Sequence, residues 1–144
     1  MARKEIVVKI QDRDQELTFK VKEMPAVRLQ KWIIRAVGLI LSSGVDLPGE
    51  NDLQRAGAYL AEHGLAVLGN IDFEEAEPLL DEMLGCCSRL VEKVEERCTP
   101  DSLDNYVQDV TTLFKLHLEA FKLNLGFFAQ GAAGLSGSPE EAAI

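Results

Sequence analysis

The chain has 144 residues, of which 47% are hydrophobic and 27% charged, a composition typical of one globular domain with its own core. Its 24 acidic and 15 basic residues give a net charge of -9, which repels the phosphate backbone of a nucleic acid. The most apolar run, from Trp32 to Leu41, is about half as long as the ~20 residues that a membrane helix needs. We recognise no signal peptide, and an odd number of cysteines does not favour a disulfide framework, so we expect a cytoplasmic protein without a membrane partner.

Alternating apolar and polar residues predict a β-hairpin over residues 4–22. The polar segment Gln11–Gln15 separates its two strands and serves as the turn. Because a hairpin alone is marginally stable in water, its apolar face must pack on a helix. The residues of that face are Ile6, Val8, Ile10, Leu17, Phe19 and Val21.

Two helices are predicted next, over residues of about 25–43 and about 51–68. Pro25 suits the first helical position, and Gly44 suits a left-handed residue at the end. Asn51 or Asp52 can cap the second helix. Small residues in the second helix either admit a close neighbouring helix or break the helix near Gly64. These small residues are Gly57, Ala61 and Gly64.

Two further helical regions are predicted over residues of about 72–97 and 100–129. Proline is disfavoured inside a helix, so the first region is expected as a short turn at 72–77 and a main helix from Pro78. The composition of residues 131–144 is typical of a flexible tail. The sequence therefore predicts a mostly α (α+β) fold, with an N-terminal hairpin followed by a bundle of about four to five helices in a single domain over 1–130.

The pattern of reactive residues predicts neither an enzyme nor a bound metal or cofactor. His63 and His117 lie in no metal-binding motif, and adjacent Cys86 and Cys87 point in different directions on a helix. A cluster of acidic residues is interpreted as a solvated face, because the spacing and central glycine of a calcium loop are missing. This cluster consists of Asp72, Glu74, Glu75, Glu77, Asp81 and Glu82.

A partner-binding surface is predicted from two features. Phe127 and Phe128 point to different sides of a helix, so they either fold back on earlier elements or form an apolar patch that accepts a partner's helix. A basic edge on the first helix pairs with the acidic cluster, within one molecule or between two. The candidate binding residues are Phe121, Leu125, Phe127, Phe128, Arg28, Lys31 and Arg35.

The order of these parts resembles the tail assembly chaperones of long-tailed bacteriophages. Two stretches carry the resemblance in detail, Lys22-Glu23-Met24-Pro25-Ala26 and the segment from Phe121 to Phe128, followed by the Gly/Ala/Ser-rich end. The resemblance covers most of the chain in layout but only these stretches in detail.

This resemblance implies a non-enzymatic protein of the host cytoplasm that binds the tape-measure protein during tail assembly and is absent from the mature virion. It also implies a longer, frameshifted form joined near 131–144, and the tail tube protein as a second partner that competes for the client. Self-association would make binding to a long client multivalent. The alternative is a structural tail-completion or connector protein that stays in the particle.

Overall fold

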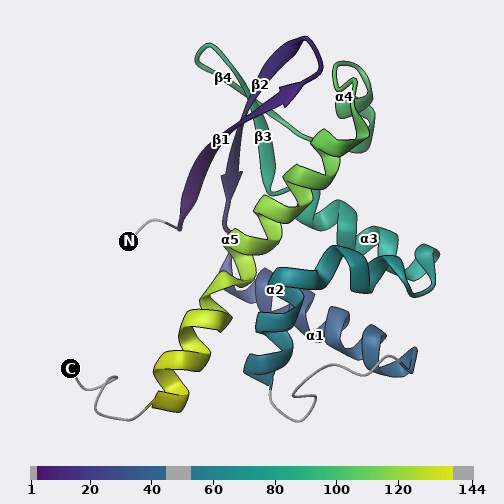
Figure 1. The fold of residues 1–144 in the computed structure, drawn as a ribbon, viewed down its shortest axis with the longest axis vertical. Coiled ribbons are helices and arrows are strands. Elements are labelled where there is room, and N and C mark those ends of the chain that lie inside the picture. Colours follow the sequence, from purple (N-terminus) through teal and green to yellow (C-terminus); the bar gives the residue numbers. More distant parts are fainter. Residues whose placement is uncertain (1–2, 45–52, 138–144) are drawn as a thin grey trace.

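A four-stranded antiparallel sheet packs on a group of helices (Figure 1). The computed structural model describes residues 3–44 and 53–137. The described elements are, in chain order, β1 (Glu5–Asp12), β2 (Gln15–Lys22), α1 (Ala26–Ser42), α2 (Leu53–Gly69), α3 (Phe73–Leu84), β3 (Cys87–Val91), β4 (Val94–Arg97), α4 (Pro100–Asp104) and α5 (Val110–Gly137). The structure confirms the predicted α+β class and the N-terminal hairpin, whereas the sheet of four strands was not predicted.

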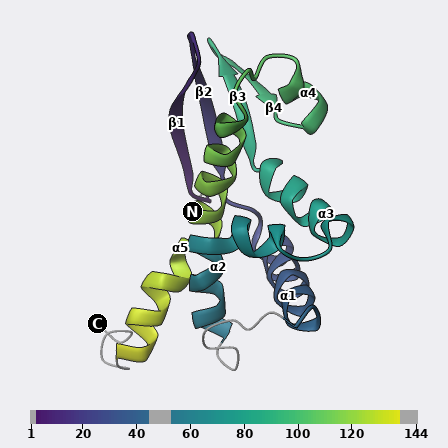
Figure 2. The same cartoon turned by 45° about the vertical axis from the view of Figure 1, so that its right-hand side comes forward.

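The hairpin of β1 and β2 forms half of the sheet. Its register runs from Glu5 opposite Lys22 to Asp12 opposite Gln15, so the turn is shorter than predicted. Arg13, in the turn, has a positive φ of 58°, a conformation that non-glycine residues seldom adopt. Helix α5 packs against β1 and β2 and covers their apolar face (Figure 2).

The predicted helix over 72–97 is wrong beyond Leu84. Helix α3 ends there, and the chain turns into β3 and β4, while Pro78 lies inside α3 and not at its start. Strand β3 forms because β2 offers it a partner, with Val21 opposite Cys87. The tight turn to β4 contains Glu92 at a φ of 56° and no glycine, so the sequence carries no usual turn signal.

The predicted helix over 100–129 is divided in two. Thr99 caps the short helix α4, and its side chain and that of Ser102 form a capping box. The chain then leaves the helical path before α5 begins at Val110. Helix α5 continues to Gly137, beyond residue 131 where a tail was predicted, and residues 138–144 lie outside the described part of the chain.

The buried carboxylate of Asp12 causes this division. It accepts hydrogen bonds from the backbone N–H groups of Gln108 and Asp109, both at 2.8 Å, and from the hydroxyl of Thr112 at 2.7 Å. Burial alone would raise the pKa of Asp12, but these bonds and one from Gln15 outweigh it and lower the pKa to about 2. A residue at the end of β1 therefore holds the start of α5.

Helices α2 and α5 meet through a close contact at Gly64. Helix α2 is continuous through this residue, which excludes the predicted alternative of a break there. A Cβ atom at Gly64 would lie 2.7 Å from the ring of Phe121, so only glycine leaves room for that ring. Phe121 in turn packs edge-to-face on Trp32 with ring centroids 5.7 Å apart. The caps predicted at Asn51 and Asp52 lie outside the described residues.

Candidate partner-binding surface

Helix α1 has apolar residues on two opposite sides. The inner side fills the core with Leu29, Trp32, Ile33, Ala36 and Ile40. On the other side, Val27, Ile34 and Leu41 remain 63%, 61% and 40% exposed. Exposed apolar residues that repeat along one side of a helix are typical of a surface that another chain covers.

The exposed residues have the spacing of a helix-packing seam. Val27, Lys31, Ile34, Gly38 and Leu41 are separated by alternating steps of four and three residues, as in a coiled coil. We call this set the outer face of α1. A Cβ atom at Gly38 would meet no atom of the described residues within 4 Å, so this part of the chain leaves the middle of the outer face open. This geometry suits the close approach of a second helix.

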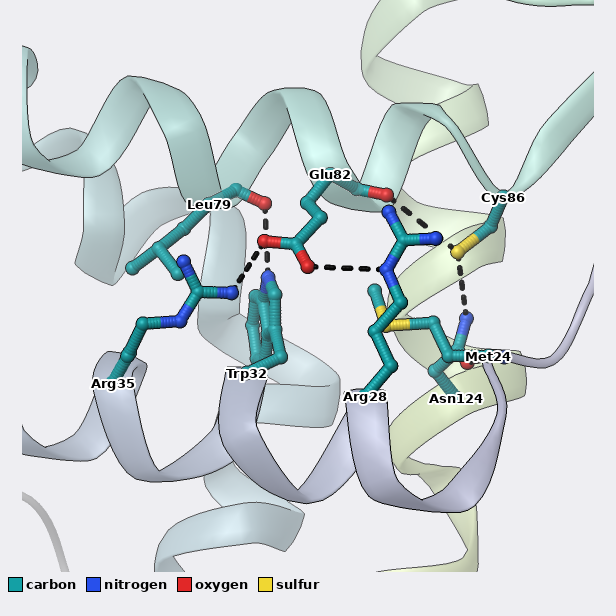
Figure 3. A network of polar contacts seen from close by, with 8 residues as sticks. All are labelled: Met24, Arg28, Trp32, Arg35, Leu79, Glu82, Cys86 and Asn124. Atoms are coloured by element: carbon teal, nitrogen blue, oxygen red, sulfur yellow. Dashed lines mark hydrogen bonds and ion pairs between the residues drawn. The ribbon is translucent and has the colours of Figure 1, made fainter.

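Basic side chains border the outer face of α1. The helix contains Arg28, Lys31 and Arg35 and no acidic residue, although the whole chain is acidic. Figure 3 shows Arg28 and Arg35 on either side of Glu82 of α3, to which both form ion pairs. Beside them lies a hollow of about 430 Å³, lined by Pro25, Val27, Arg28, Lys31, Arg35 and Glu82.

Hydrogen bonds beneath α1 hold it in place. The indole N–H of Trp32 donates to the carbonyl of Leu79 at 3.0 Å (Figure 3). At the start of α1, the buried side-chain oxygen of Asn124 accepts from the backbone N–H of Met24 at 2.7 Å. These bonds connect α1 to α3 and α5, so the outer face is presented from a fixed support.

The amide of Asn124 also lies 3.6 Å from the sulfur of Cys86. Burial raises the pKa of the Cys86 thiol to about 11, despite this amide and nearby Arg28. The thiol is therefore neutral at pH 7, and a neutral thiol is a poor nucleophile.

The structure separates the predicted binding residues into three groups. Arg28, Lys31 and Arg35 are exposed, whereas Phe121 and Leu125 are fully buried in the core and offer no surface to a partner. The side chains of Phe127 and Phe128 lie outside the described residues. The predicted pairing of the basic edge with the acidic cluster is present within the molecule, through Glu82.

The apolar part of the outer face was not identified from the sequence. Its apolar residues Val27, Ile34 and Leu41 are absent from the candidate binding residues predicted from the sequence. The available signal was that apolar residues surround the helix on more than one side, which exceeds what a single core-facing stripe needs.

Within residues 3–44 and 53–137, no group of three or more His, Cys, Asp or Glu side chains is arranged to hold a metal ion. None of the helices in that part of the chain is both long and apolar enough to cross a membrane.

Comparison with known families decides the class of this protein. The model of the family described as phage tail assembly chaperone protein, TAC, matches residues 16–136. The chain belongs to the phage tail assembly chaperone family. No curated protein and no solved structure matches it. Membership of this chaperone family, which is generally non-enzymatic, implies action in the host during tail assembly and phage tail proteins as partners.

Proposed function

We propose that this chaperone binds the tape-measure protein, keeps it soluble while the tail is assembled in the host cytoplasm, and leaves before the virion is complete. The observation that carries the proposal is the outer face of α1 in a member of this family. A tape-measure protein is long and helical, and its apolar seams are uncovered before the tail tube forms. Such seams need an apolar surface that accepts helices.

The outer face of α1 fits one helix of such a client. Val27, Ile34 and Leu41 would contact its apolar residues, and Gly38 would allow the two backbones to approach closely. Arg28, Lys31 and Arg35 favour a helix with acidic residues beside its apolar seam. Because Glu82 already pairs with both arginines, acidic residues of the client would replace one surface ion pair by another at little cost.

Release requires no chemical step in this proposal. The tail tube protein competes for the same apolar seams of the client, and the chaperone is displaced as the tube grows. The net charge of -9 keeps the complex of chaperone and client dispersed until then.

Co-expression with the tape-measure protein of the same phage tests the proposal. We expect soluble client with the wild-type chaperone and a loss of most of it with Ile34→Glu, which places a charge at the centre of the outer face. Val110→Glu is the matched control, because Val110 is 60% exposed on another helix.

The results of this co-expression test bear separately on the chaperone function and on the outer face of α1 as the binding surface. A client that is as insoluble with the wild-type protein as without it contradicts the chaperone proposal. Equal solubility with Ile34→Glu and wild type leaves the function standing and rejects the outer face of α1. Mass spectrometry of purified virions gives a second test, since a chaperone is absent from them and a structural component is present.

A further inference from the structure

The two edges of the sheet differ in how they are protected. Strand β4 is short, and its exposed residues include the charged Glu95, Glu96 and Arg97. Strand β1 is longer, has no proline or bulge, and is bordered on its outer side by no other strand of the described residues (Figures 1 and 2). Natural proteins seldom leave such an edge open, because its free N–H and C=O groups pair readily with another strand.

The positions of β1 that point outward follow from its hydrogen bonds. The backbone N–H of Glu23 donates to the carbonyl of Lys4, so even-numbered positions of β1 face β2. The backbone groups of Glu5, Val7 and Lys9 therefore face away from the sheet. Val7 is also 56% exposed, and its side chain lies on the sheet face that α5 does not cover.

Charge complementarity identifies the occupant of this edge. If a second β1 pairs antiparallel with Val7 opposite its own copy, Glu5 of each chain lies opposite Lys9 of the other. All three residues then form the hydrogen-bonded pairs that their orientation requires. A shift by two residues in one direction places Lys9 opposite Arg3, and a shift by four in the other places Lys9 opposite Lys9. Of these registers, only the one with Val7 opposite Val7 therefore forms both Glu5–Lys9 pairs.

We propose that this chaperone forms a two-fold symmetric dimer through β1, in which the two sheets join into one. Ile6 and Val8, which are partly buried against the core, become neighbours across the new contact on the face covered by α5. On the opposite face, Val7 meets Val7 between two Glu5–Lys9 pairs. The dimer uses a surface other than the outer face of α1. An experiment that disproves the dimer therefore leaves the proposed function untouched, and the reverse also holds.

The oligomeric state of the full chain tests this inference, measured by analytical ultracentrifugation over a range of concentrations. We expect a dimer with a dissociation constant on the order of micromolar, because the contact is small. Val7→Pro removes an N–H group that no bond within the sheet uses, and it should give a monomer with an unchanged circular dichroism spectrum. Val7→Lys, which leaves the backbone intact, should do the same, whereas Val94→Lys on β4 should remain a dimer.

Exchange of the charges tests the register. Glu5→Lys and Lys9→Glu should each weaken the dimer by about tenfold, because symmetry places two like-charge pairs in the contact. The double variant restores both pairs and should recover the wild-type affinity. A wild-type monomer at about 1 mM, a dimer that persists in Val7→Pro and Val7→Lys, or a double variant as weak as the single ones would overturn the proposal.

Discussion

The outer face of α1 and the contact between α2 and α5 are built alike but differ in what they face. Each is an apolar side of a helix with a glycine in its middle. At Gly64 the ring of Phe121 occupies the space that the glycine leaves, whereas no atom of residues 3–44 or 53–137 lies within 4 Å of the corresponding position at Gly38. The contact between α2 and α5, which we call the inner contact, shows how this chain packs one helix on another. The outer face of α1 has the same combination of apolar residues and a central glycine, but its residues remain exposed.

The largest expected effect on stability is at the inner contact, where Phe121 lies against Gly64. Phe121→Ala removes a fully buried ring from between Gly64 and Trp32 and should lower the free energy of unfolding by about 4 kcal/mol. Ile34→Ala on the outer face should change it by less than about 0.5 kcal/mol. Urea denaturation of both variants measures the difference, and similar losses would mean that the outer face is already packed within the chain.

The support of the inner contact depends on Asp12, which holds the start of α5. Asp12→Asn should cost about 3 kcal/mol, because it removes the charge of a buried carboxylate that accepts hydrogen bonds from four donors. The pKa of Asp12 is about 2 in the folded protein against its ordinary 3.8, so its stabilisation is complete above pH 4 and is lost as pH falls through 2. Unfolding curves between pH 5 and pH 2 should therefore fall more steeply for wild type than for Asp12→Asn, and parallel curves would contradict this role.

An added methyl group distinguishes the two glycines more finely. At Gly64 it collides with the ring of Phe121, and Gly64→Ala should destabilise the protein by about 2 kcal/mol although alanine favours the helix. Thermal unfolding followed by circular dichroism measures this loss. A stability equal to that of wild type would show that α5 can move away from α2 without cost.

The same substitution at Gly38 should have a smaller effect than at Gly64 and the opposite sign. Gly38→Ala meets open space and should stabilise the protein by about 0.8 kcal/mol, the difference in helix propensity. If the outer face packs closely on a helix of the tape-measure protein, this variant should also bind the client more weakly. If Gly38→Ala is more stable and binds the client as well as wild type does, then Gly38 does not contact the client and the two helices do not pack closely there.

The elements that local patterns determine could be predicted from the sequence. The hairpin, α1 and α2 follow from strong periodicity, and Thr99-Pro100 marks the start of α4. Strand β3 could not be predicted, because apolar residues continue at helical spacing from Leu79 to Val94 and the strand depends on a distant partner, β2. The break before α5 was equally hidden, since a carboxylate from β1 causes it.

The candidate surface was predicted in part for a similar reason. The basic residues Arg28, Lys31 and Arg35 could be located because charges on a helix stay at its surface. Phe121 and Leu125 have the residue types of a binding patch, but both are fully buried, and the pattern of α5 alone does not reveal that α2 packs on this helix. Whether an apolar stripe is core or surface depends on the packing partner.

The order of synthesis adds a consequence to the Asp12 contact. Asp12 and Thr112 are 100 residues apart, as are Met24 and Asn124. At about 5–20 residues per second on a bacterial ribosome, the hairpin leaves the exit tunnel about 5–20 s before α5 can cover it. During that time its apolar face and open edge are both uncovered. A member of a chaperone family is thus itself prone to aggregate while it is being made, and slower translation of its second half would lengthen that exposure.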